Sequence, residues 1–152
     1  MADIEQIRKL LETSTLAGGV DTNAIQDAEK SLGVQFPPSY RTFLSQFGAV
    51  LCSGFEIAGL FDANGDDDRP PLWSNVVTST SQRRRVSGGL IPKGHVAISD
   101  DGGDYTFYLD TSRPDAQGEC PVIVLGPGAD AVVAADDFFD FLRRSFDGNV
   151  SF

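Results

Sequence analysis

Two aspartate-rich segments hold the residues of this sequence best suited to chemistry. The first contains Asp62, Asp66, Asp67 and Asp68, and the second contains Asp100, Asp101 and Asp104. Carboxylate oxygens are the ligands that hard cations such as calcium and magnesium prefer, and two neighbouring carboxylates can act as an acid and a base. Both kinds of site therefore have to be weighed against a purely structural use of these residues.

Neither segment matches a metal site well. The first resembles the start of an EF-hand calcium loop, but Gly65 comes too early, and Trp73 stands at the twelfth position, where that loop needs a glutamate. The second could hold magnesium, but Asp100 to Asp104 also has the composition of a tight turn. In such a turn glycines take positive φ and aspartates accept hydrogen bonds from the local backbone. We favour the turn, and we expect neither a metal nor a cofactor.

Other catalytic groups are few. His95 is the only histidine, and it directly precedes a predicted strand, where a surface or strand-edge histidine is a simpler interpretation than a catalytic one. The sequence has no G-x-S-x-G motif, no H-E-x-x-H motif and no P-loop lysine. Cys52 and Cys120 are isolated, so they predict neither a disulfide framework nor a zinc site, and they favour a reducing compartment. We therefore expect a protein without enzymatic activity.

The charge balance favours a basic protein as partner. There are 22 acidic and 12 basic residues, which gives a formal charge of −10. A field of this sign repels nucleic acid and anionic lipid and attracts basic surfaces. The one basic run, residues 83–85, lies near a predicted helix end, where it complements the helix dipole. No apolar stretch is long enough for a membrane span, and acidic residues near the start argue against a signal peptide, so we expect a cytoplasmic protein.

Three helices are predicted in the first third of the chain. Apolar residues recur at helical spacing over residues 3–15. A second helix begins at Asp21 or Thr22 and ends at Gly33. A third begins near Pro38, carries an apolar face and ends at Gly48. These helices precede a region of different character.

Strands dominate the remainder. We predict strands at 55–61, 96–99, 105–110, 121–125 and 131–134, an ambiguous segment at 73–85 that we interpret as a helix, and a final helix with a phenylalanine-rich face after Asp136 or Asp137. This order predicts a single α+β domain over residues 1–152, with N-terminal helices and a C-terminal helix packed on a mainly antiparallel β-sheet.

Several of these segments together resemble the SUKH superfamily, whose eukaryotic members include a yeast regulator of cell-wall synthesis. The resemblance is carried by Glu29 and Leu32-Gly33, by Pro38 and the Tyr40-x-x-Phe43-Leu44 helix that ends at Gly48, by Val96 to Asp104, by Asp110, by Gly118 to Val122, and by Phe138 to Leu142. The matches span most of the chain, but residues 62–94 fit least well.

The resemblance implies an α+β fold and a non-enzymatic role. Bacterial members of the superfamily are mostly immunity proteins that bind and neutralise a polymorphic or contact-dependent toxin domain, often a nuclease. Because nucleases hold phosphates, such a toxin is expected to be basic, and the seven aspartates of the two segments are then the expected contact groups. The alternative is a regulatory scaffold related to the cell-wall synthesis regulator. A metal-dependent hydrolase would require the two aspartate segments to converge in one pocket.

Overall fold

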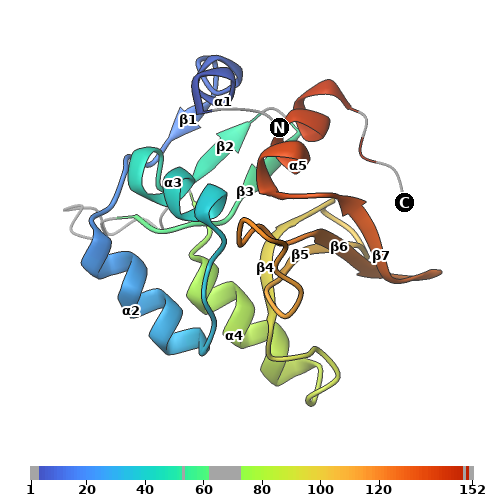
Figure 1. Ribbon diagram of the computed structural model, residues 1–152. Coiled ribbons are helices and arrows are strands. Elements are labelled where there is room, and N and C mark those ends of the chain that lie inside the picture. The colour runs from blue at the N-terminus through green and yellow to red at the C-terminus, as the bar shows by residue number, and fades with distance from the viewer. Residues whose placement is uncertain (1–3, 53, 62–72, 149, 151–152) are drawn as a thin grey trace, which may run out of the picture.

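The computed structural model describes residues 4–52, 54–61, 73–148 and 150 (Figure 1). Three helices and a small sheet come first: α1 (Ile4–Leu10), β1 (Thr15–Leu16), α2 (Thr22–Leu32), α3 (Pro38–Gln46), β2 (Val50–Cys52) and β3 (Phe55–Ile57). A fourth helix, a strand meander and a last helix follow: α4 (Val76–Val86), β4 (His95–Asp100), β5 (Thr106–Asp110), β6 (Val122–Gly126), β7 (Ala129–Ala135) and α5 (Phe138–Asp147).

The strands form two antiparallel sheets. One has the order β1-β2-β3 and the other the order β4-β5-β6-β7, so each strand pairs with the strands next to it in sequence. The amide of Ala58, directly after β3, donates to Ile98 O of β4 at 2.8 Å and joins the two sheets. Figure 1 shows α5 above the meander and α4 beside β4. The predicted α+β fold with antiparallel strands is confirmed.

Local capping chemistry sets the helix ends. The Asp21 side chain accepts from Ala24 N to begin α2, and Gly33 ends it in the left-handed region at φ 70°. Asp137 caps α5 in the same way by accepting from Asp140 N. The ambiguous segment at 73–85 is indeed a helix, but it begins at Val76, because Asn75 accepts from Val77 N and Thr78 N.

One core joins both halves of the chain, and Tyr40 lies at its centre. The Tyr40 ring packs edge-on against Phe36 and Phe138, with centroids 5.2 and 4.9 Å apart. Its hydroxyl donates to Ala58 O at 2.7 Å, so the buried polar atom is satisfied. The predicted apolar faces of the third and last helices are the faces that this core buries. The N-terminal helices and the final helix thus pack on one another and on the sheets.

The small sheet and the elements beside it differ from the prediction. The first helix ends at Leu10, because Thr15, predicted to be helical, pairs with Leu51 in the small sheet. β2 was not predicted at all. The strand predicted at 55–61 stops at Ile57, because Gly59 then bridges in parallel to Asn75, and Leu60 N donates to Gly48 O at 2.9 Å. The chain leaves the sheet there to bring α4 alongside β4.

Candidate functional site: an acidic turn between two pockets

The β4–β5 turn places three of the predicted site residues on the surface. Asp100 Oδ1 accepts from Gly102 N at 2.8 Å, and Asp101 Oδ1 accepts from Gly103 N at 2.8 Å and from Tyr105 N at 3.2 Å. Gly102 has a φ of 78°, which a side chain would disfavour. These are the bonds expected of a turn, so that interpretation is confirmed. All three aspartates remain exposed.

Arg83 of α4 fixes one side of this turn. Its Nη2 lies 3.2 Å from Asp100 Oδ2, and its Nη1 donates to Thr106 Oγ1 at 2.9 Å. The next residue, Arg84, donates to the carbonyls of Leu32 and Lys93. The basic run does lie in the last turn of α4, where it complements the dipole. In addition, two of its guanidinium groups bind across the fold.

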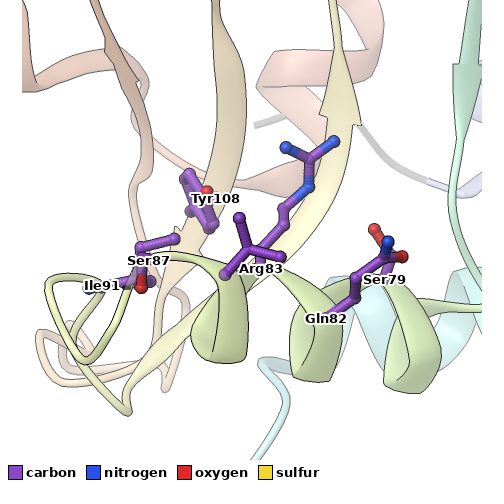
Figure 2. Close-up of a pocket in the computed structure, with 7 residues that line it drawn as sticks. Ser79, Gln82, Arg83, Ser87, Ile91 and Tyr108 are labelled. Atoms are coloured by element: carbon purple, nitrogen blue, oxygen red, sulfur yellow. Dashed lines mark hydrogen bonds between the residues drawn. The ribbon is translucent and has the colours of Figure 1, made fainter.

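A pocket of about 390 Å³ opens between α4 and the sheet (Figure 2). It is lined by Ser79, Gln82, Arg83, Val86, Ser87, Ile91 and Tyr108. In Figure 2 the Arg83 side chain extends from α4 toward the strands beside Tyr108. Burial raises the pKa of Tyr108 against the opposing effects of Arg83 and Thr106, so its hydroxyl keeps its proton at neutral pH.

Two large apolar side chains are exposed at the end of α4 and in the loop that follows it. Val86 is 78% exposed, and Leu90, in the loop that follows α4, is 86% exposed. Both residues lie where the chain enters β4 at His95, whereas the acidic turn leaves β4 at Asp100, so they do not border the turn.

A second pocket, of about 280 Å³, lies on the other side of the turn. It is lined by Gly54, Phe55, Ser99, Asp100, Asp101, Phe107, Phe141, Ser145, Gly148 and Val150. The residues come from β3, β4, β5 and the end of α5, which meet at this edge of the fold. Asp100 and Asp101 thus line the aromatic pocket under α5, and Asp100 reaches the pocket on α4 through its ion pair with Arg83.

The other predicted contact residues, Asp62, Asp66, Asp67 and Asp68, lie outside the described residues. The convergence of the two aspartate segments that a metal-dependent hydrolase would require therefore involves residues outside the described ranges. Within the ranges that the structure describes, no group of three or more histidine, cysteine, aspartate or glutamate side chains is arranged to hold a metal ion.

His95 differs from the sequence-based expectation. It does not precede β4 but begins it, and it is buried at 7% exposure instead of lying on the surface. Its Nδ1 lies 3.8 Å from Asp110 Oδ1, which is beyond hydrogen-bond distance, and has no hydrogen-bond partner. Burial lowers the pKa of His95 most; Asp110 opposes this and Arg113 adds to it. The ring is therefore neutral at pH 7 and packs 5.8 Å from the ring of Tyr108.

Sequence reasoning missed the structural roles of two glutamates. Glu29 Oε2 accepts from Phe36 N at 2.7 Å and from Arg41 Nη2 at 2.8 Å, which ties α2 to the start of α3. Glu119 is buried and accepts from both the backbone and the hydroxyl of Ser39. The signal for both lay in the family pattern, which contains these positions, but nothing in that pattern says what they bind.

The two cysteines have no features of reactive thiols. Burial, followed by the neighbouring carboxylates, raises the pKa of Cys120 to about 11. Burial also raises the pKa of Cys52, although a hydrogen bond with Ser14 opposes the shift. Both thiols are therefore protonated at neutral pH, and the thiolate is the reactive form.

A protein-family model described as SUKH_5, SMI1-KNR4 cell-wall, matches residues 2–147. The chain therefore belongs to the SUKH family, a family of toxin-immunity proteins that is generally non-catalytic. No helix among the described residues has the length and apolar character to cross a membrane.

A second comparison finds part of a plant enzyme. A GDSL esterase/lipase of Arabidopsis thaliana is 32% identical over 92 residues, which is 58% of this chain. The matched region spans only 29% of that protein, so most of the plant protein has no counterpart here. This chain contains no Gly-Asp-Ser-Leu sequence.

Proposed function

We propose that this chain is an immunity protein that binds and neutralises a cognate polymorphic or contact-dependent toxin domain in the cytoplasm of the cell that makes the toxin. The observation that carries the proposal is the exposed acidic β4–β5 turn, set between two pockets in a member of the SUKH family. The turn offers a protein partner negative charge and a concave surface together.

The charge indicates which kind of toxin would fit. A formal charge of −10 steers basic surfaces toward the chain, and the turn concentrates three carboxylates at one place. A nuclease domain presents such a basic surface, because it must hold phosphates. An immunity protein that covers this surface would exclude the nucleic acid substrate. The proposed contact groups are Asp100, Asp101 and Asp104, together with Asp62, Asp66, Asp67 and Asp68.

Binding without catalysis agrees with the state of the only histidine. His95 is buried and neutral, and its Nδ1 contacts neither a serine nor a cysteine through a hydrogen bond within the described residues. A general base would need to be within hydrogen-bond reach of the group that it deprotonates. We propose on this ground that the chain is not an esterase, despite the partial match to the plant enzyme.

The test is protection against the toxin domain encoded beside this chain's gene. Cells that express the chain should survive induction of that toxin, and calorimetry should show direct binding that weakens as salt is raised. Replacing Asp100, Asp101 and Asp104 by Asn keeps an acceptor atom for each turn amide and removes three charges. This variant should lose protection and bind at least about tenfold more weakly.

A matched control removes the same charge elsewhere. Glu12→Gln, Asp27→Asn and Asp115→Asn change three exposed acidic residues away from the turn and should leave protection intact. If the purified chain binds no neighbouring toxin and gives no protection, the immunity function is refuted. If both triple variants weaken binding equally, total charge and not the turn directs the partner.

The alternative, a non-enzymatic regulatory scaffold, draws on the cell-wall description of the matching family. Under this alternative the gene has no toxin neighbour, and deleting it alters cell-wall synthesis in cells that never meet a toxin. Genomic context and the phenotype of the deletion separate the two functions.

A further inference from the structure

The pocket beneath α5 has an aromatic interior. Phe107 of β5 and Phe141 of α5 are 7% and 2% exposed, and their ring centroids lie 5.1 Å apart at an interplanar angle of 46°. Phe55 of β3 forms a further wall, and its own ring is held edge-on by Phe146 at 5.1 Å. Because the rings are fixed by the core and by each other, the pocket is preformed.

Carboxylates form one side of the same pocket. Asp100 and Asp101 both line it, and its lining contains neither lysine nor arginine among the described residues. Asp100 shares Oδ2 with Arg83, whereas Asp101 uses Oδ1 for the turn and has no ion-pair partner within the described ranges. Asp101 therefore keeps a carboxylate oxygen for a donor from outside the chain.

Aromatic rings beside carboxylates favour an organic cation. The faces of aromatic rings attract cationic groups, and carboxylates form strong charge-assisted hydrogen bonds with them. Arginine suits both surfaces better than lysine, because its flat guanidinium group stacks on rings and presents several donors to a carboxylate. A volume of about 280 Å³ lies at the small end for ligand sites, so it suits one long side chain.

We propose that this pocket receives a single arginine side chain of the partner protein, with its guanidinium group against Phe55 and its donors on Asp101. The identity of the partner rests on the proposed immunity function, but the recognition of arginine does not. Buried aromatic and arginine anchors carry much of the affinity of protein interfaces, so the pocket would act as the centre of the contact.

The first experiment tests the pocket without any toxin. Nα-acetyl-arginine amide is titrated into the isotope-labelled full chain, and backbone amide shifts are followed by NMR. Saturable shifts are expected at Asp101, Phe107 and Gly148, with a dissociation constant on the order of millimolar, as befits one small group. The neutral analogue Nα-acetyl-citrulline amide should bind at least about tenfold more weakly, because it has the same shape without the charge.

Two variants and a matched control test whether arginine amide binds in this pocket. Asp101→Asn keeps the acceptor for Gly103 N and Tyr105 N, so it should preserve the turn and weaken arginine binding about tenfold. Asp115→Asn is the matched control, because Asp115 Oδ1 accepts from Gln117 N and Glu119 N with the same spacing, in the loop at the other end of β5. Phe55→Leu keeps an apolar wall and removes the ring, and should also weaken binding.

The second experiment uses the neighbouring toxin domain. Asp101→Asn should weaken toxin binding about tenfold, whereas Asp115→Asn should not. If the toxin binds wild type and Asp101→Asn equally, and arginine amide causes no saturable shift, the pocket proposal is overturned while the immunity function stands. If no toxin binds but arginine amide titrates the pocket, the immunity function fails and the pocket stands. If Phe55→Leu unfolds, the Asp101→Asn variant still tests the pocket proposal, because Asp101 is exposed and its replacement should preserve the fold.

Discussion

The start of α3 is capped by Glu119, which lies in a loop 80 residues after Ser39 in the sequence. The residue at the N-cap position of this helix is Pro37, which has no side-chain hydrogen bond to offer. Glu119 Oε2 accepts from Ser39 N at 3.0 Å, and Oε1 accepts from Ser39 Oγ at 2.6 Å. Both side chains are buried, so bulk water does not already solvate these bonds.

Glu119→Ala should therefore be costly. It leaves the buried Ser39 amide without an acceptor, at about 1–3 kcal/mol, and removes the hydrogen bond from the Ser39 hydroxyl, at about 1 kcal/mol. We expect the free energy of unfolding to fall by about 2–4 kcal/mol, a large share of the roughly 5–15 kcal/mol that keeps a domain folded. Equilibrium urea unfolding followed by far-UV circular dichroism measures this, and the midpoint should fall by about 1–2 M.

Two control variants show whether the loss of stability comes from the capping hydrogen bonds. Glu119→Gln keeps an acceptor oxygen for Ser39 N, so it should lose about half as much as the alanine variant. Glu12→Ala changes an exposed glutamate and should stay within about 0.5 kcal/mol of wild type. If Glu119→Ala also stays within about 0.5 kcal/mol, the reasoning that a distant carboxylate caps α3 is refuted.

Two further predictions concern His95 and Gly59. Burial is the main cause that lowers the pKa of His95 in the folded state. The neutral His95 ring therefore contributes to stability above its ordinary pKa of 6.5, and this contribution is lost as the pH falls through the lower pKa of the folded state. An NMR titration of the ring should give a midpoint below 6.5, and a midpoint above 6.5 would mean that Asp110 outweighs burial. Gly59→Ala should cost at least about 3 kcal/mol in urea unfolding, because the new Cβ would overlap the Gly48 carbonyl, a backbone atom that cannot move aside. Gly54→Ala is the control, because a Cβ at Gly54 has no atom within 4 Å and only the positive φ disfavours it, at about 1 kcal/mol. Equal losses of stability in the two variants would contradict the packing argument.

Helices were predicted well because local residues specify their ends. Asp21, Gly33 and Asp137 act within one turn of the helix that they cap, so their effect can be recognised from neighbouring residues. The small sheet has no comparable signal. β1 has only two residues, and it exists because Thr15 pairs with Leu51 far along the chain. A pattern of alternation cannot be recognised in two residues.

The candidate site was predictable in part for the same reason. The turn at Asp100 to Asp104 follows from local aspartate and glycine chemistry, and the structure forms it with the expected bonds. The aromatic pocket beside it requires Phe55, Phe107 and Phe141, which belong to three different elements. Each of these residues looks like an ordinary core phenylalanine in the sequence. Only their convergence next to the turn makes them a site.

The total charge of the chain does not say where a partner meets negative charge, because some carboxylates are paired with arginines of the chain itself. Glu29 pairs with Arg41, Asp110 with Arg113, and Asp140 with both Arg143 and Arg144. These pairs neutralise the carboxylates locally and leave the formal charge of −10 to the other acidic residues. At the β4–β5 turn, Asp100 is the only aspartate paired with an arginine of the described residues.

Asp101 shows how one residue can serve both the fold and a partner. Its Oδ1 builds the turn, which explains an aspartate there without any function, while the same turn holds the carboxylate against an aromatic pocket. A basic partner would be steered by the overall field but oriented at this one place. Replacement by Asn separates the two roles, since the amide oxygen keeps the turn and the charge is lost.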